Sequence, residues 1–383
     1  MTSDALFIQK WFDLGIEISP FKLPLSAAIQ KVETQIFDGI FGVFNDSLPD
    51  GWGRLLMDRK IISSGLNLAD INPLHRLAIT GISGPGALIY QPMMEQDAEF
   101  VPLFDLDDYA VETQKILFDQ QSIYLDQLFL LCGSSGGARP KINIGYDASQ
   151  DKIHYGPQNL PSNFEPWIIK FSSAQDHDDL AKIEYAYYLM ALDAGLIMSP
   201  CRLFKSESGK YYFGTKRFDR DGKKRLHMHS AAGLLHDNFR LSMLDYGHLM
   251  DATFRLEKSV VAYEKILRLA TFNVYSHNLD DHSKNVAFLM NDKGEWQLSP
   301  SYDLTFSYST YGHHSTMVAG ESKNPGKEHL NKLATHFGVQ GLAQIIDAVR
   351  SVLSRWNVYA DQAMIANHTR DEISKALKIK NSM

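Results

Sequence analysis

The stretch that decides the fold is Asp280-Asp-His-Ser-Lys-Asn285-Val-Ala-Phe-Leu-Met290-Asn-Asp-Lys-Gly-Glu-Trp296-Gln-Leu-Ser299, followed by Asp303. Two apolar segments, 285–290 and 296–299, flank a turn of Asn, Asp, Lys and Gly, which predicts a β-hairpin. Because a hairpin returns the chain on itself, we expect Asn285 and Asp303 to lie close together. Amide and carboxylate oxygens held in this way suit Mg²⁺, which shares its oxygen ligands with substrate phosphates.

The residues before the hairpin have the spacing of a kinase catalytic loop. Asp280 stands five positions before Asn285. Protein kinases place the catalytic base and a metal-binding Asn at this interval, and use a later Asp for metal. The order of base, Asn, hairpin and Asp is therefore kinase-like. On this motif alone, the alternative is that residues 280–282 are turn residues after a helix.

A glycine-rich segment, Gly133-Ser-Ser-Gly-Gly-Ala-Arg-Pro-Lys141, lies in the first half of the chain. Glycines allow a backbone to approach phosphates closely, and its free N–H groups can bind the oxygens. The segment lacks the G-x-x-x-x-G-K-[ST] pattern of a P-loop. It is therefore either a phosphate-binding loop of another kind or a hairpin loop that contains two serines.

Two further features fit a nucleotide site. Lys170 lies on a predicted strand and Glu184 on the following predicted helix, as in the kinase pair of a phosphate-binding Lys and a helix Glu. The segment Gly214-Thr-Lys-Arg-Phe-Asp-Arg220 ends a strand where the chain turns helical. Such a hinge suits adenine recognition by backbone groups, with Asp219 near a ribose hydroxyl. The alternatives are a surface lysine with a solvated glutamate, and a charged strand end.

Hydrophobic periodicity predicts the remaining elements. Alternation predicts a hairpin of 141–146 and 152–155, a buried strand at 167–171 and a second hairpin of 203–205 and 211–218. Spacings of three and four residues predict helices at 178–194, 259–277 and 341–356. The first helix should end at Gly195, and its apolar face is made of Leu180, Ile183, Tyr187, Met190 and Ala194. Another helix should begin after Asp50, whose carboxylate can accept hydrogen bonds from the first free N–H groups.

Composition excludes several classes of protein. The chain has 383 residues, 44% of them hydrophobic, so it can bury a large core and is not globally disordered. Its net charge of −7 argues against a broad nucleic-acid-binding surface. The two cysteines lie far apart and outside any CxxC pair, which fits a reducing compartment and gives no zinc site. The sequence shows neither a secretory signal nor an apolar run long enough to span a membrane, so a cytoplasmic location is expected.

Histidines and tryptophans offer two alternative sites that the sequence does not favour. His227 and His229, together with His236, could bind a metal, but no further ligand stands at a convincing spacing. Ordinary packing is the better interpretation. The five tryptophans are scattered along the chain, which indicates core residues and not a stacking platform for bases.

The motifs follow one another in a specific order. They read GSSGGARPK (133–141), WIIKFSS (167–173), EYAYYLMALDAGL (184–196), GTKRFDR (214–220), LDDHSKN (279–285) and LSPSYDL (298–304). In this order and wording the chain resembles the HipA family of serine/threonine kinase toxins. SLPDGWGRLL (47–56) and HRLAITGISGPGAL (75–88) are similar to the family's N-terminal region, and SAAGLLH (230–236) and LDYGHLM (244–250) to its C-terminal half. The resemblance covers nearly the whole chain.

The resemblance implies an α+β, bilobal protein-kinase-like (HipA-like) fold, with a mixed α/β N-terminal lobe and a mostly helical C-terminal lobe. It also implies three regions: an N-terminal subdomain at 1–120, the nucleotide-binding part of the N-lobe at 121–218 and a helical C-terminal lobe at 219–383. The family usually opens with a strand pair before the segment that is similar to ALFIQKWFDLG (5–15). The N-terminal subdomain is therefore expected to lack its first strands.

The resemblance further implies roles for individual residues. Asp280 would be the catalytic base, and Asn285 and Asp303 would hold Mg²⁺. Contacts to ATP would come from Gly136, Gly137, Ala138, Arg139, Pro140, Lys141, Lys170, Lys216, Arg217, Phe218, Asp219, His282, Lys284, Asn285, Tyr302 and Asp303. Ser134 matches the family's autophosphorylated serine, and the adjacent Ser135 is the alternative. A phosphate dianion there would repel the phosphates of ATP, which explains why modification would end activity.

The implied activity is that of an ATP- and Mg²⁺-dependent serine/threonine protein kinase, the toxin of a type II toxin–antitoxin pair. Its substrate would be a translation-related protein such as an aminoacyl-tRNA synthetase. Its partner would be a small helix-turn-helix, HipB-like antitoxin, through which alone it would meet DNA. The phosphate loop reads GGARPK and departs from some family members, so the choice of substrate does not follow. Two alternatives stay open: a small-molecule kinase with the same core, and an inactive nucleotide-binding partner in a repressor complex.

Overall fold

The computed structural model describes residues 11, 13–94, 105–134, 136–156, 160–173, 176–307 and 312–382. The chain divides into two compact units. Residues 44–181 and 200–227 form one, called here the sheet unit, and residues 1–43, 182–199 and 228–383 form the other, the helical unit. Among the described residues, no helix is both long and apolar enough to cross a bilayer.

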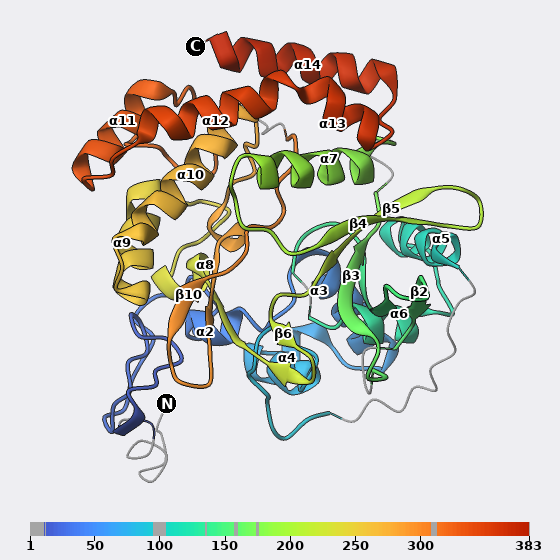
Figure 1. Ribbon diagram of the computed structural model, residues 1–383. Coiled ribbons are helices and arrows are strands. Elements are labelled where there is room, and N and C mark those ends of the chain that lie inside the picture. The colour runs from blue at the N-terminus through green and yellow to red at the C-terminus, as the bar shows by residue number, and fades with distance from the viewer. Residues whose placement is uncertain are drawn as a thin grey trace. The chain divides into compact units, whose positions relative to one another are not determined.

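An antiparallel sheet of five strands, ordered β2-β1-β3-β5-β4, organises the sheet unit (Figure 1). Its strands are β1 (Lys141–Asp147), β2 (Lys152–His154), β3 (Glu165–Lys170), β4 (Cys201–Lys205) and β5 (Tyr211–Lys216). β1 pairs with β2 and β4 with β5, so both predicted hairpins are confirmed, and β3 confirms the predicted strand at 167–171. A two-stranded ribbon of β6 (Arg220–Asp221) and β7 (Lys224–Arg225) follows β5.

Helices pack on this sheet through apolar side chains. They are α3 (Gly51–Ser63), α4 (Pro73–Thr80), α5 (Leu106–Leu117) and α6 (Leu125–Cys132), with the short 3₁₀ helix η1 (Leu68–Asp70). Trp52 of α3, Tyr109 of α5 and Leu128 of α6 are at most 1% exposed and join Ile142 and Ile169 of the sheet in one core. Each such side chain stabilises the fold by about 1.5–3 kcal/mol when fully buried.

The start of α3 differs from the prediction in one respect. Asp50 is the residue that precedes the helix, as predicted, but its side chain makes no capping hydrogen bond to the first turn. The carboxylate instead accepts a hydrogen bond from the backbone N–H of Gly137. Gly51 has a φ of +45°, a turn that glycine tolerates and that brings the helix start against the glycine-rich loop. The predicted cap is therefore wrong, because a long-range acceptor role replaces it.

The helical unit contains most of the helices. They are α2 (Gly42–Asn45, which continues into the sheet unit), α7 (Leu180–Asp193, which begins there), α8 (Ala231–Leu235), α9 (Tyr246–Glu257), α10 (Val261–Tyr275), α11 (Lys327–His336), α12 (Leu342–Ser354), α13 (Trp356–Gln362) and α14 (Asn367–Ser382). α10 and α12 confirm the predicted helices at 259–277 and 341–356. α10 contacts α9, α11, α12 and α14, and so forms the centre of this unit (Figure 1).

The predicted helix at 178–194 is confirmed as α7. Ile183, Tyr187, Met190 and Ala194 are at most 5% exposed, and they belong to the core of the helical unit. Gly195 ends the helix with a φ of +83°, and the N–H of Leu196 donates to the carbonyl of Ala191. This is the glycine-dependent helix end that satisfies the last free carbonyl groups.

A small sheet carries the loop that was singled out in the sequence. Its order is β10-β9-β8, with β8 (His227–Ser230), β9 (Ala287–Met290) and β10 (Trp296–Leu298). β9 and β10 pair antiparallel, with Met290 opposite Trp296, which confirms the predicted hairpin. The fold class is α+β, as predicted: one unit has an antiparallel sheet with helices, and the other is mainly helical.

Candidate active site

The loop between α10 and β9 presents Asp280 to solvent. The Asp280 side chain is 59% exposed, and its Oδ1 lies 3.7 Å from Nε2 of His282. Its backbone, in contrast, is fixed: the N–H of Asp280 donates to Oγ of Ser307 at 3.0 Å, and the N–H of Leu279 donates to the same oxygen at 2.9 Å. An accessible carboxylate on a fixed backbone is what a general base requires.

Asn285 ends the same loop, in the 3₁₀ helix η2 (Ser283–Asn285). Its Nδ2 donates a hydrogen bond to the carbonyl oxygen of Asp280 at 2.9 Å. This contact fixes the amide group and leaves its Oδ1 available as an acceptor or ligand. Asp280 and Asn285, which the motif sets five positions apart, are thus joined directly.

Asp303 follows β10 and has an unusual backbone. Its φ is +54°, in the left-handed region, which costs a residue other than glycine about 1–3 kcal/mol and is concentrated at functional sites. The preceding Tyr302 donates its hydroxyl to the carbonyl of Lys284 at 2.6 Å. The N–H of Ser299 also donates to the carbonyl of Ala287 at 2.9 Å. The hairpin therefore brings the segment before Asp303 against the segment around Asn285.

The donor set of this loop fits a magnesium ion and fits zinc poorly. Among the described residues, no group of three His, Cys, Asp or Glu side chains could hold a metal. Asn285 and Asp303 offer hard oxygen atoms, but two side chains cannot fill the octahedral coordination of Mg²⁺ by themselves. Mg²⁺ is commonly bound in this way, with one or two side-chain oxygens and the rest from water and substrate phosphates.

The glycine-rich loop, residues 136–141, lies in the sheet unit and is joined to the start of α3. Gly137 has a φ of +98°; its N–H donates to Asp50, and its carbonyl accepts from the N–H of Trp52 at 3.1 Å. A Cβ atom on Gly51 would lie 2.6 Å from the Gly137 carbonyl oxygen, so this close approach requires glycine at position 51. The ammonium group of Lys141 donates to the carbonyl of Gly136.

Two lysines lie directly opposite each other in the sheet beyond this loop. Lys141 of β1 and Lys170 of β3 are Cα partners, so both side chains project from the same face. Like charges in this arrangement destabilise a strand pair, and a bound polyphosphate would offset the repulsion. Nζ of Lys170 also lies 5.5 Å from the ring centroid of Phe213. Glu184, which was expected to orient Lys170, belongs to the helical unit.

The rest of the glycine-rich loop is held from both sides. Arg139 donates from Nε to both carboxylate oxygens of Asp176, at 3.1 and 3.3 Å, and Ala138 stands beside it in the chain. The carbonyl of Pro140 accepts from the N–H of Phe171 at 2.8 Å. Ser134 is 2% exposed, and its hydroxyl has no hydrogen-bond partner within the described residues. The alternative modification site, Ser135, lies outside the described residues.

The segment after β5 carries a buried ionic cluster. Asp219 is 4% exposed, and its carboxylate accepts from Nε and Nη2 of Arg217, from Nη1 of Arg220 and from the N–H of Gly86. Burial alone would raise the pKa of Asp219, but the charge and hydrogen bonds of Arg217, and then those of Arg220 and Gly86, outweigh it and hold the pKa well below its usual range. Its oxygens are thus engaged by protein groups.

Five further hydrogen bonds from two arginines, not anticipated from the sequence, complete this cluster. Arg225 donates to the carbonyl oxygens of Ile82, Gly84 and Gly86, and Arg220 to those of Gly84 and Gly86. Burial, and then the charge of Arg217, lowers the pKa of Arg220 to about 9. Arg220 and Arg225, together with the Asp219 carboxylate that binds the Gly86 N–H, therefore hold the loop 82–86 in place.

Lys216 and Arg217, the first two residues of the expected adenine hinge, are anchored to the start of β3. The ammonium group of Lys216 donates to the carboxylate of Glu165, and the N–H of Arg217 donates to the carbonyl of Pro166 at 2.9 Å. Phe218, next in the chain, is half-buried. Arg217 also donates to Oδ1 of Asn143 at 2.7 Å, which links the hinge to β1.

The structure gives packing roles to two of the histidines that were considered as metal ligands. Nε2 of His229 lies 3.0 Å from Oγ of Ser19, and Nε2 of His236 accepts from the N–H of Gly42 at 3.1 Å.

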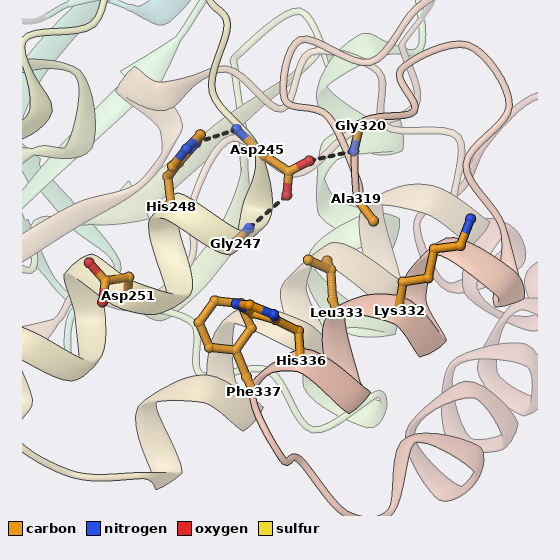
Figure 2. Close-up of a pocket in the computed structure, with 10 residues that line it drawn as sticks. All are labelled: Asp245, Gly247, His248, Asp251, Ala319, Gly320, Lys332, Leu333, His336 and Phe337. Carbon is orange, nitrogen blue, oxygen red and sulfur yellow. Dashed lines mark hydrogen bonds between the residues drawn. The ribbon is translucent and has the colours of Figure 1, made fainter.

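A separate open groove in the helical unit, about 580 Å³ in volume, is shown in Figure 2. Asp245 at its edge accepts from the N–H groups of Gly247 and Gly320 at 2.8 and 2.7 Å. None of the predicted site residues lines this groove.

The contact of Asp50 with the glycine-rich loop leads to a testable prediction. In Asp50→Ala the Gly137 N–H loses a hydrogen bond to a charged group, worth about 1.5–3 kcal/mol. We expect its amide hydrogen exchange to speed up by about tenfold or more, since every 1.4 kcal/mol corresponds to a factor of ten. Residue-resolved exchange by NMR would measure this, with the exposed Asp70→Ala as the control. Unchanged exchange at Gly137 would show that Asp50 does not hold the loop.

Comparisons with known proteins place the chain in a family. Residues 6–91 match the HipA N-terminal domain and residues 133–356 match the HipA-like C-terminal domain. The chain therefore belongs to the HipA family. A comparison with curated protein sequences gave no match.

Comparison with solved structures identifies the fold. The chain is similar to Shewanella oneidensis MR-1 HipA, solved as a toxin–antitoxin complex of HipA, HipB and operator DNA, with a TM-score of 0.66 and 17% identity over 97% of this chain and 89% of that one. A lower similarity is found to the Helicobacter pylori proinflammatory kinase CtkA, with a TM-score of 0.40 and 13% identity over 57% of this chain and 87% of that one. The likeness to the Shewanella protein confirms a HipA-like fold.

Proposed function

We propose that the protein is a HipA-type kinase that transfers the γ-phosphoryl group of ATP to a serine or threonine of a protein, with the help of Mg²⁺. The observation that carries the proposal is the loop from Asp280 to Asn285. It presents an exposed carboxylate on a fixed backbone, with the Asn285 amide bound to the carbonyl of the same aspartate. Such an arrangement is what a general base of phosphoryl transfer needs.

In this mechanism each polar group of the loop has one task. Asp280 accepts the proton of the substrate hydroxyl as the hydroxyl oxygen bonds to the γ-phosphorus of ATP, while the bond from that phosphorus to the β–γ bridging oxygen breaks and ADP leaves. Oδ1 of Asn285 and the carboxylate of Asp303 would hold Mg²⁺, which would neutralise charge on the phosphates. His282, Lys284 and Tyr302 line the nucleotide site. Since the chemistry needs little covalent participation, catalysis rests on positioning and charge neutralisation.

In the sheet unit we assign the phosphate contacts to the loop 136–141 and to Lys170. The opposed lysines at 141 and 170 support this assignment, because an anion between them would relieve their repulsion. Lys216, Arg217 and Phe218 supply the hinge for adenine. Asp219 is buried and fully hydrogen-bonded, so we assign to it the support of this hinge in place of a direct contact to ribose.

The wider role follows from the family. The HipA structure that the chain resembles is bound to HipB and operator DNA, and we propose a small HipB-like antitoxin as the partner here, with DNA bound through it. Autophosphorylation is assigned to Ser134. Its burial means that the serine must leave its place before a phosphate can be accommodated. An aminoacyl-tRNA synthetase is the proposed substrate on the strength of the family resemblance alone.

The metal dependence tests the proposal. Phosphoryl transfer by the purified protein is expected to stop with excess EDTA and to return with Mg²⁺. Asp303→Ala should raise the Mg²⁺ concentration needed for half-maximal transfer by about tenfold or more, since even indirect ligand contacts are worth 10–100-fold in metal affinity. The control is Asp292→Ala, in the exposed turn of the same hairpin. Transfer that is indifferent to EDTA, or equal metal dependence in the two variants, would overturn the assignment of Asp303.

A further inference from the structure

Asp281, the aspartate next to the proposed base, is buried, whereas Asp280 is exposed. Asp281 has a side chain that is 1% exposed, whereas that of Asp280 is 59% exposed. Oδ1 of Asp281 accepts from the backbone N–H groups of Ser315 and Thr316, at 2.8 and 3.3 Å. Its Oδ2 accepts from the hydroxyl of Tyr246 at 2.8 Å and lies 3.0 Å from Nδ1 of His314.

Four polar groups face the two carboxylate oxygens of Asp281. A carboxylate can accept from several donors at once, whereas a protonated carboxyl would have to donate. Tyr246 is a reliable donor, because burial and then the charge of Asp281 raise its pKa well above the ordinary value. The imidazole proton of His314 is accordingly assigned to Nδ1, facing the carboxylate. Asp281 therefore has no oxygen left over to act on a substrate.

The network continues into the core of the helical unit. The Tyr246 hydroxyl, at the start of α9, also accepts from Nδ2 of Asn273 on α10 at 2.9 Å. Oδ1 of Asn273 accepts from Nδ2 of Asn278, and Oδ1 of Asn278 accepts from Oγ of Ser307. Ser307 is the residue that binds the N–H of Asp280. A continuous chain of hydrogen bonds therefore connects the backbone of Asp280 to α10 and α9.

Further hydrogen bonds join the same loop to Ser315 and Thr316, and the next residue to the start of α9. The carbonyl of Asp281 accepts from the hydroxyl of Thr316 at 2.6 Å, and the carbonyl of Leu279 from the N–H of Ser315 at 3.1 Å. The N–H of Met317 donates to the carbonyl of Leu244, just before α9. The side chain of Asp281 therefore joins α9 and the 314–316 segment.

We propose that Asp281 is a positioning residue for phosphoryl transfer: its buried carboxylate fixes the loop so that Asp280 faces the substrate hydroxyl and Asn285 faces the metal. This inference rests on the proposed function for its catalytic meaning. Its structural content, that Asp281 immobilises residues 279–285, stands apart from it.

Two kinds of measurement test the proposal. In kinetics, Asp281→Ala is expected to lower kcat by about 100-fold, the cost of misplacing a reacting group by about 1 Å, with the KM for ATP and the nucleotide Kd changed less than threefold. Tyr246→Phe should lower kcat less. Added to Asp281→Ala it should cost less than it costs alone, because the two changes share one hydrogen bond and only the bond from Asn273 is newly lost. The control is Asp251→Asn, an exposed carboxylate on α9.

Amide hydrogen exchange separates this proposal from the proposed function. Asp281→Asn and Tyr246→Phe should each speed exchange at residues 279–285 and 315–317 and leave α12 unchanged. If the wild type transfers no phosphate, the proposed function fails, and the exchange pattern still decides whether Asp281 holds the loop. The proposal is overturned if exchange in the loop is unchanged, if kcat stays within threefold, or if the loss of kcat only follows a lower folded fraction.

Discussion

Replacing Asp280 with asparagine is expected to lower kcat for phosphoryl transfer by about 10³-fold, within the 10²–10⁴-fold range of general base catalysis. The amide keeps the size of the carboxylate but cannot take up the proton of a hydroxyl nucleophile. Because the side chain is 59% exposed and the backbone is held by Ser307 and Asn285, the fold should be unaffected. The loss should therefore appear in kcat, with the nucleotide Kd nearly unchanged.

Initial rates with labelled ATP, together with nucleotide titrations of the same preparations, measure this prediction. Asp251→Asn serves as the matched control, because it makes the same chemical change at an exposed position of the same unit. If Asp280→Asn keeps a kcat within threefold of wild type, Asp280 is not the base. A loss of nucleotide binding in parallel with kcat would instead show that the change disturbs the site.

Asp219→Ala is expected to destabilise the protein by about 3–5 kcal/mol, the usual cost of breaking a buried ion pair from one side. Removal of the carboxylate leaves Arg217 and Arg220, which are 12% and 13% exposed, without their shared counter-charge. It also removes the acceptor of the Gly86 N–H. Since Arg225 and Arg220 bind the loop 82–86, this loop should loosen together with the segment after β5.

Denaturant unfolding of wild type and variant measures this second prediction. Asp119→Asn is the control, because it removes an ion pair with Arg59 in which the carboxylate is 98% exposed, and such pairs contribute at most about 1 kcal/mol. Asparagine also tolerates the left-handed backbone of this position, where φ is +59°. The stabilisation by Asp219 also depends on pH. Its folded-state pKa is depressed, so the contribution is fully present above the unfolded value of about 3.9 and declines as the pH falls below it. Equal stability of the two variants at pH 7 would contradict the account.

Local patterns in the sequence were sufficient for many of the elements. The hairpin of β9 and β10 could be predicted from two short apolar segments on either side of Asn291-Asp-Lys-Gly294. All of these residues are close together in the chain. α7 follows from apolar residues at spacings of three and four, and its end follows from Gly195. In each case the residues that determine the element are neighbours in the chain.

Side-chain contacts between distant segments could not be predicted in this way. Asp50 was expected to cap α3 because aspartate before a helix usually does so, but its acceptor role goes to Gly137, 87 residues away. Arg225 binds Gly84, 141 residues away, and nothing in the local sequence points to that carbonyl. The sequence placed Asp280 and Asp281 side by side, and only the fold distinguishes the exposed carboxylate from the buried one.

The compact units also divide the chain differently from the matched domains. The HipA N-terminal domain covers residues 6–91 and the C-terminal domain residues 133–356, but residues 44–91 pack in one unit with the sheet. A shared apolar core joins these residues to the sheet, with Trp52 and Leu56 in the same cluster as Ile142. In addition, Asp50 binds the glycine-rich loop, and the N–H of Gly86 donates to Asp219. We therefore expect changes in residues 44–91 to alter nucleotide binding as well as any antitoxin contact.

The most direct test of the central claim is transfer of label from γ-labelled Mg·ATP by the purified protein, with and without lysate of the host cell. The account predicts label on a protein, either this chain at Ser134 or a lysate protein, which disappears with EDTA and in Asp280→Asn. Label that enters only small molecules would contradict protein phosphorylation. Bound nucleotide without any transfer would contradict the kinase activity itself.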